Sequence, residues 1–277
     1  MGLERARFAL PSFSMPIVGP EDPTYAHLSD LTRVDCTMPF RRGATVVDMA
    51  NQAWRRIQEA GLDRRTPADF LGVSRGGTLT SLTVREAYEC GQTIRKFLRA
   101  NSPTEEDRGF WNLTVDSVQE VRKDRTYKGR GSYQALAWEA TKSLMRTLWN
   151  DPFLRMPRSL TQGYDSQITE RLLTDYIRGI NPEQFDSGFH IHVVTATRDR
   201  IGPVKSAANT IERIKERFST ESVTSNRTLK EDIMVTRTDL VGVPFSHHVV
   251  TGDHSMPEQV GAEIWGGYVK ELLEEAA

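Results

Sequence analysis

The chain has 277 residues, 38% of them hydrophobic and 26% charged, which is typical of one globular domain with room for an insertion. Lys and Arg total 36 against 37 Asp and Glu, and this net charge of −1 argues against a nucleic-acid partner held by bulk electrostatics. Two cysteines, Cys36 and Cys90, are too few for a disulfide framework and show no metal-site spacing. No segment approaches the roughly 18 apolar residues of a membrane span, and the N-terminus lacks a signal-peptide core. We therefore expect a soluble, cytoplasmic protein with no membrane span.

Up to residue 100 the sequence predicts short strands that alternate with helices. Apolar positions repeat at helical spacing between Thr45 and Ala60, and Gly61 ends that helix. Because strands separated by helices pair in parallel through right-handed crossovers, the pattern indicates an α/β chain. The candidate strands are 7–10, 32–36, 68–73 and 93–98, and the candidate helices are 23–31, 45–60 and 76–90.

Residues 101–184 interrupt this alternation with charged and helical sequence. Helical spacing is strongest at 132–149 and at 165–180, and prolines mark the joints. We interpret the segment as a helical cap domain inserted over one end of the sheet, with an ordinary packing subdomain as the alternative. The α/β core then comprises 1–100 and 185–277.

After the insertion the alternation of strands and helices returns. The segment 189–196 is the most strand-like of the chain, and a helix at 204–218 follows it. Residues 219–239 are polar and have no clear pattern. A last strand at 245–250 precedes a closing helix at 258–275. The whole pattern predicts a mostly parallel sheet of about six strands flanked by helices.

The segment Gly72-Val73-Ser74-Arg75-Gly76 has the Gly-x-Ser-x-Gly pattern of a nucleophile elbow and lies between a candidate strand and a candidate helix. A serine stands clear of a sheet only where the chain turns sharply from strand to helix, which crowds the nearby backbone. Glycines remove the side chains that would clash there, and the following helix directs free N–H groups to the same place. By itself the pattern also fits a serine in a tight glycine turn.

Two further polar residues follow candidate strands. Asp199 lies after 189–196, and His254 lies after 245–250. Because the carboxyl ends of parallel strands share one edge of a sheet, Ser74, Asp199 and His254 can meet there. A serine nucleophile needs an imidazole to take its proton, and the imidazole needs a carboxylate to hold its tautomer. The three residues are therefore a candidate catalytic triad.

Each of these residues has an alternative interpretation. Asp199 can cap the helix after it or pair with a neighbouring arginine, and Glu105 or Asp107 is then the rival acid. His254 can be a histidine on a surface loop. The other strand histidines are expected to be structural: His190, His192, His247 and His248.

In this order the motifs resemble the α/β-hydrolase family, in which a serine, an acid and a histidine follow one another along the chain. The resemblance covers nearly all of the chain outside the insertion. It implies an α/β-hydrolase fold that lacks the first strands, because few residues precede the elbow. The motifs that carry it are Gly72-Val73-Ser74-Arg75-Gly76-Gly77, Thr197-Arg198-Asp199-Arg200-Ile201-Gly202-Pro203 and Gly252-Asp253-His254-Ser255.

The loop that would complete an oxyanion hole departs from the family pattern. Pro11-Ser12-Phe13-Ser14 stands where the family often carries His-Gly. By analogy, the backbone N–H groups of Phe13 and Arg75 would hold the oxyanion.

The resemblance implies an esterase-like serine hydrolase that cleaves a carboxylic ester or a related acyl bond through an acyl-enzyme. Its partner is a small-molecule acyl substrate, and the chemistry needs no metal or organic cofactor. The alternative is a catalytically inactive α/β-hydrolase-fold module for binding or assembly. A second copy or another protein could cover a sheet edge that the missing strands expose.

Overall fold

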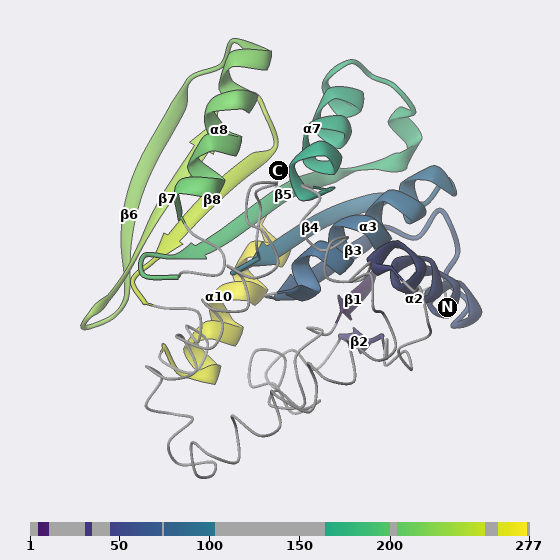
Figure 1. Ribbon diagram of the computed structural model, residues 1–277, viewed down its shortest axis with the longest axis horizontal. Coiled ribbons are helices and arrows are strands. Elements are labelled where there is room, and N and C mark those ends of the chain that lie inside the picture. The colour runs from purple at the N-terminus through teal and green to yellow at the C-terminus, as the bar shows by residue number, and fades with distance from the viewer. Residues whose placement is uncertain are drawn as a thin grey trace.

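The structure is a computed structural model that describes residues 5–10, 31–34, 45–73, 75–102, 164–199, 204–252 and 260–275. These residues form one twisted sheet with helices on both faces (Figure 1). In chain order the elements are β1 (Ala6–Leu10), β2 (Thr32–Arg33), α2 (Val46–Glu59), β3 (Ala68–Val73), α3 (Arg75–Glu89), β4 (Ile94–Ala100), α7 (Tyr164–Ile177), β5 (Phe185–Ala196), α8 (Val204–Phe218), β6 (Ser222–Lys230), β7 (Ile233–Leu240), β8 (Phe245–Val250) and α10 (Ala262–Glu274).

The sheet has eight strands in the order β2-β1-β3-β4-β5-β8-β7-β6. The six strands from β2 to β8 in this order are parallel, which confirms the expected mostly parallel sheet of about six strands. The hairpin of β6 and β7 adds two antiparallel strands beyond β8. This hairpin occupies the polar segment for which the sequence analysis assigned no structure.

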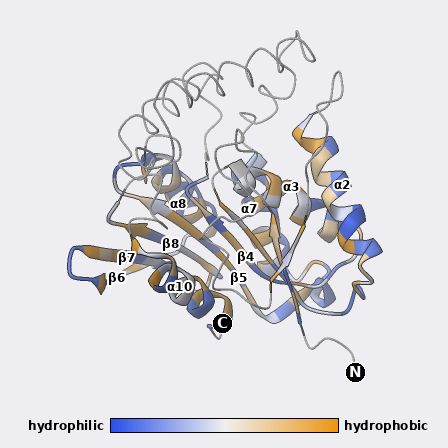
Figure 2. Cartoon of the chain, turned by 90° about the horizontal axis from the view of Figure 1, so that it is seen from below, coloured by the Kyte–Doolittle hydropathy of each residue, from blue (hydrophilic) through white to orange (hydrophobic). Residues whose placement is uncertain are grey.

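Side chains alternate along each strand, so the sheet has an apolar core on each face. On β4, Phe97 belongs to the larger core, whereas Leu98 belongs to the smaller one. Helices α2, α3, α7 and α8 contribute to the larger core, and α10 covers the other face (Figure 2).

Helix α2 shows why the local sequence folds as predicted. Thr45 caps its N-terminus, accepting a hydrogen bond from the Asp48 backbone N–H while the Asp48 carboxylate accepts one from the Thr45 N–H. Ala50, Trp54 and Ile57 lie on its buried face and pack into the larger core. The amphipathic spacing read from the sequence therefore corresponds to the packed face.

Helix α7, which the sequence analysis assigns to the cap, packs against α3. Its residues Ile168, Leu172 and Leu173 are buried in the larger core. Most of the expected cap, residues 103–163, lies outside the described residues, as do residues 23–30 of the predicted helix 23–31. The cap domain and its boundaries therefore stay predictions. In the described parts of the chain, no helix combines the length and apolar character needed to cross a membrane.

Candidate active site

The candidate catalytic residues follow three parallel strands of the sheet. Ser74 comes after β3, Asp199 three residues after β5 and His254 four residues after β8. Strands β5 and β8 are neighbours, and β4 separates β3 from β5. Because all four strands run in the same direction, their carboxyl ends lie at one edge of the sheet. Ser74 and His254 lie outside the described residues, so the triad stays a prediction.

The turn from β3 to α3 is as sharp as the elbow motif requires. The strand ends at Val73 and the helix begins at Arg75, which leaves one residue, Ser74, between them. A Cβ atom added to Gly72 would lie 2.1 Å from the Thr80 hydroxyl and 2.5 Å from the Gly76 carbonyl oxygen. Only glycine fits at position 72 without a shift of the helix backbone.

A second glycine lets α3 approach the end of β4. A Cβ atom on Gly77 would lie 2.4 Å from the Ser102 hydroxyl and 2.5 Å from the Ser102 Cβ. The first turn of α3 is further held by Thr80, whose hydroxyl donates to the Gly76 carbonyl at 2.7 Å. Close packing therefore fixes the helix start relative to the ends of β3 and β4.

Of the two residues expected to form the oxyanion hole, Arg75 and Phe13, the structure describes only Arg75. Arg75 is the first residue of α3, and the first N–H groups of a helix have no acceptor within the helix. Its backbone N–H is therefore available to an acceptor near the end of β3, and its role in an oxyanion hole stays a prediction. Phe13 lies outside the described residues.

The loop that carries Asp199 is tied to the loop that leads to His254. The Thr197 N–H donates to the Val250 carbonyl at 2.9 Å, and the Arg198 N–H donates to the Gly252 carbonyl at 2.8 Å. The Thr197 hydroxyl donates to the Gly252 carbonyl at 3.3 Å and accepts from the Gly252 N–H at 3.2 Å. Asp199 itself is buried, and its N–H donates to the Ala196 carbonyl at 3.1 Å. These bonds extend the β5–β8 pairing past the strand ends as far as Gly252, where the described part of the second loop ends.

A buried ion pair lies beside the elbow and is not predicted from the sequence. Arg99 on β4 and Asp165 on α7 are both almost completely buried, and their Nη1 and Oδ2 atoms lie 3.4 Å apart. The hydroxyls of Thr78 and Ser102 each donate to the same Asp165 oxygen at 3.3 Å. Burial lowers the pKa of Arg99, and the Asp165 carboxylate opposes that shift. The cluster joins α7 to the start of α3 and the end of β4.

The alternation of basic and apolar residues in β4 is the one sequence signal that points to this cluster. It predicts a strand but does not say which basic residue faces a helix. Asp165 lies in the segment expected to form the cap, and its partner precedes it by 66 positions, so no local pattern connects the two residues.

The strand histidines are structural, as the sequence analysis expects. His192 Nδ1 lies 3.2 Å from His248 Nε2, and the Tyr268 hydroxyl lies 2.7 Å from His248 Nδ1 beneath α10. His247, on the other face, lies 2.8 Å from the Thr195 hydroxyl through Nε2. Burial lowers the pKa of His247 to about 4 and that of His190 to about 3. These imidazoles are therefore neutral at pH 7. One ring atom of this group, His192 Nε2, is buried without a hydrogen-bond partner in the described structure.

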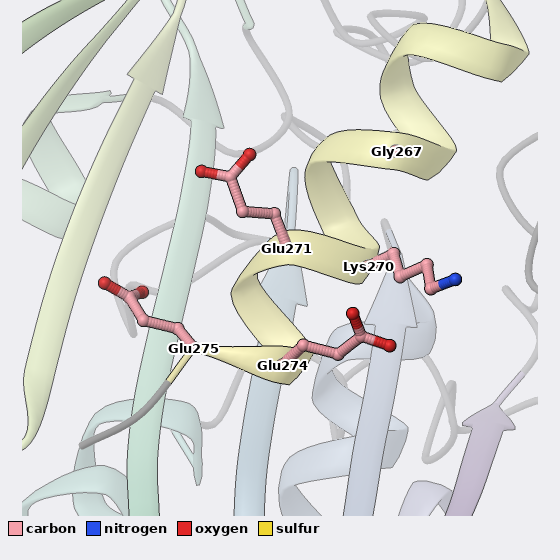
Figure 3. A pocket seen from close by; sticks show the side chains of 5 residues that line it. All are labelled: Gly267, Lys270, Glu271, Glu274 and Glu275. Atoms are coloured by element: carbon pink, nitrogen blue, oxygen red, sulfur yellow. The ribbon is translucent and has the colours of Figure 1, made fainter.

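A surface hollow lies on the outer side of α10, away from the candidate triad. The hollow is lined by residues from the second half of the helix, which ends near the starts of the strands (Figure 3). These residues are Gly267, Lys270, Glu271, Glu274 and Glu275. At that end Arg95 on β4 donates to the Leu273 carbonyl at 2.6 Å. The elbow and the two tied loops lie at the opposite ends of the strands, so this hollow is not the candidate active site.

No protein-family model and no curated protein matches the chain. Solved structures share its fold: an esterase from Pyrococcus furiosus has a TM-score of 0.55 at 13% identity and covers 99% of this chain and 83% of its own. A non-heme bromoperoxidase, BpoC, from Mycobacterium tuberculosis has a TM-score of 0.54 at 11% identity over 98% of this chain and 92% of its own. The type II thioesterase BorB from the borrelidin biosynthetic cluster has a TM-score of 0.51 at 16% identity over 98% and 93%. All three are members of one superfamily.

The chain has the α/β-hydrolase fold. The expected fold class is thereby confirmed. In this α/β-hydrolase fold, β3 is the strand before the predicted elbow, and β5 and β8 are the strands before the predicted acid and histidine loops. Identities of 11–16% show the fold alone, so the roles of the individual residues stay predictions.

Proposed function

We propose that the protein is a serine hydrolase that cleaves a carboxylic ester or a related acyl bond through an acyl-enzyme. Ser74 is the nucleophile, His254 is the general base and acid, and Asp199 orients the imidazole. The observation that carries the proposal is the one-residue turn between β3 and α3, crowded so closely at Gly72 that a side chain is excluded. An α/β fold uses this turn to raise a serine hydroxyl above the sheet.

The pairing of the acid and histidine loops supports the same assignment. The backbone bonds of Thr197 and Arg198 to Val250 and Gly252 join the loops just before Asp199 and His254. A buried carboxylate held beside the histidine loop is suited to fix the imidazole tautomer and to stabilise the imidazolium that forms during catalysis.

The reaction proceeds in two half-reactions. His254 takes the proton of the Ser74 hydroxyl as its oxygen attacks the substrate carbonyl, and the tetrahedral oxyanion accepts hydrogen bonds from the N–H groups of Arg75 and Phe13. His254 then gives the proton to the leaving alcohol or thiol, which departs and leaves the acyl group on Ser74. A water molecule, deprotonated by the same imidazole, attacks the acyl-enzyme, and the released serine recovers its proton.

The neighbouring structures narrow the class of bond. An esterase and a type II thioesterase are among those that share the fold. Oxygen esters and thioesters differ in the leaving atom but use the same nucleophile and oxyanion hole. We therefore assign acyl esters and acyl thioesters of small molecules as the substrates.

A fluorophosphonate probe tests the proposal, because it reacts covalently with an activated serine. We expect the probe to label Ser74 and the protein to hydrolyse p-nitrophenyl esters or acyl thioesters in a series of chain lengths. Ser74→Ala is expected to abolish labelling and to lower kcat by several orders of magnitude. Ser187→Ala, which changes an exposed serine at the start of β5, is the matched control and is expected to retain both.

The roles of the other two residues require separate variants. His254→Ala and Asp199→Asn are each expected to lower kcat by several orders of magnitude without unfolding the protein. Failure of the intact protein to react with the probe or to hydrolyse any ester or thioester in the series would overturn the proposal. The fold would then act as a module for binding or assembly.

A further inference from the structure

In the described part of the chain, strand β6 is an edge of the sheet. It is the last strand in the sheet order and, in the described part of the chain, pairs with β7 alone. Figures 1 and 2 show it as the outermost strand of the hairpin. Every one of its nine residues is exposed except Leu229, which is partly buried. The opposite edge of the sheet, β2, is two residues long.

The backbone of β6 has hydrogen-bonding groups that point away from the molecule. The Val241 N–H donates to the Glu221 carbonyl at 2.9 Å, so Glu221 turns its carbonyl toward β7. Orientation alternates along an antiparallel strand, so the odd-numbered residues bond to β7. The even-numbered residues from Ser222 to Thr228 therefore direct their N–H and C=O groups outward. The alternation ends at an irregularity between Thr228 and Lys230.

Over residues 222–228 the edge has little of the usual protection against another strand. Proteins block exposed edges with proline, with charged side chains or with very short strands. Strand β6 is nine residues long and contains no proline, and its lysine, Lys230, lies at the end of the strand beyond the irregularity. The charge of Arg227 is compensated by an ion pair with Glu271 on α10. Val223 is 59% exposed, an unusual exposure for a valine in a strand.

We propose that two copies of this chain associate through β6, antiparallel and edge to edge, about a two-fold axis at Asn226. In this register Asn226 lies opposite its own copy, and the outward groups of Thr224 meet those of Thr228 in the partner. The two sheets then form one continuous sheet across the interface. Such an isologous contact is closed, because each copy uses the same strand.

The side chains of β6 are complementary to themselves in this register. Thr224 faces Thr228 of the other copy, which is a favourable cross-strand pair, and Val223 comes next to Leu229, the residue at the irregularity. Arg227 faces Ser225, so the two arginines do not lie opposite each other. A register shifted by two residues places Val223 against Arg227 and leaves the valine uncovered. The apolar contact of Val223 and the separation of the two Arg227 side chains therefore both favour a two-fold axis at Asn226.

Two substitutions test the interface without touching the backbone bonds of the hairpin, although both remove the hydrogen bond that the Asn226 amide oxygen accepts from the Thr236 hydroxyl at 2.8 Å. Asn226→Pro removes an outward N–H and leaves the odd-numbered residues free to bond to β7, so the fold is expected to remain. Asn226→Lys places two like charges opposite each other across the axis. Sedimentation velocity across a wide concentration series is expected to show a dimer for the wild type and a monomer for both variants, with unchanged circular dichroism.

Cross-linking tests the register. In a background with Cys36→Ser and Cys90→Ala, Asn226→Cys is expected to cross-link with a short bis-maleimide, because the two Cα atoms lie about 5.5 Å apart. Ser222→Cys is the matched control, since its two copies lie eight positions apart, or about 27 Å, and are not expected to cross-link.

Three outcomes would overturn the proposal. These are a wild-type monomer at all concentrations, a dimer that survives both Asn226 substitutions, and cross-linking at Ser222→Cys in place of Asn226→Cys. A fourth outcome, capture of a different β-strand by monomeric protein, would assign the edge to another partner and would contradict the proposal as well. None of these outcomes depends on the proposed hydrolase activity.

Discussion

Thr197 and Gly252 exchange two hydrogen bonds across the ends of β5 and β8, with the Thr197 hydroxyl donating to the Gly252 carbonyl and accepting from the Gly252 N–H. The contact lies two residues before Asp199 in one loop and two residues before His254 in the other. A single hydroxyl therefore links the segments that carry two members of the proposed triad.

Thr197→Val removes this link while keeping the shape of the side chain. We expect it to lower the free energy of unfolding by about 1 kcal/mol and kcat by roughly tenfold, because a small displacement of a catalytic group is costly. Urea unfolding and ester hydrolysis measure the two effects. Thr238→Val, the same change on the β6–β7 hairpin, is the control and is expected to leave kcat unchanged. An unchanged kcat in Thr197→Val would show that the link supports only the fold.

Gly72→Ala tests the crowding at the elbow. The new Cβ would meet the Gly76 backbone carbonyl at 2.5 Å, which a side-chain rotation cannot relieve. We expect a loss of about 3 kcal/mol in the free energy of unfolding together with loss of activity. Gly267→Ala is the matched control, because its Cβ would meet nothing within 4 Å in the exposed part of α10. The control is expected to gain about 1 kcal/mol of stability. Equal effects of the two changes would contradict the crowded turn.

Neutral buried histidines predict loss of stability in acid. Burial lowers the pKa of His247 from the ordinary 6.5 to about 4 and that of His190 to about 3. At a pH between the ordinary pKa of 6.5 and the lowered pKa of each folded histidine, the unfolded chain binds a proton that the folded chain does not. The free energy of unfolding therefore decreases as the pH falls below 6.5, by an amount on the order of 3 kcal/mol for His247 alone at pH 4.

Chemical unfolding at a series of pH values measures this slope. His247→Gln keeps a hydrogen-bonding group near Thr195 but cannot titrate, so its stability is expected to decrease less steeply. Parallel slopes for the wild type and the variant would show that His247 does not contribute.

The ion pair between Arg99 and Asp165 predicts non-additive substitutions. Asp165→Asn leaves a buried guanidinium without its counter-charge and is expected to cost about 3–5 kcal/mol of stability. Adding Arg99→Met removes the uncompensated charge, and the amide introduced at position 165 still accepts from Thr78 and Ser102. The double variant is therefore expected to recover much of the loss in urea unfolding. A double variant less stable than Asp165→Asn would contradict this account.

The sequence predicts most of the fold where one face of an element is buried. The bounds expected for β3, β8 and α8 agree with the structure, since each has a clear apolar pattern. Strand β5 begins at Phe185, four residues earlier than expected, because the Phe185 ring packs against Tyr88 and Phe189. The β6 strand escapes prediction because both of its faces are exposed and no alternation results.

The candidate site is predictable in its motifs but not in its surroundings. The order of Ser74, Asp199 and His254 follows from local patterns, and the carboxyl-edge rule brings their strands together. Sequence distance would suggest that β5 pairs with the β6–β7 hairpin that comes next, yet it pairs with β8. The pairing of Arg99 with Asp165 likewise depends on the packing of α7, which no local pattern specifies.

The β6–β7 hairpin lies between β5 and β8 in the sequence, and this position affects the order in which the strands pair. Strands β6, β7 and β8 follow one another in sequence and pair as an antiparallel meander, so they need no distant partner to begin. Strands in such a meander are joined by short loops, and contacts between them form faster than contacts between distant parts of the chain. Residues 222–250 can therefore fold as a local unit during synthesis, and docking of β8 onto β5 becomes the slower, long-range event that completes the sheet.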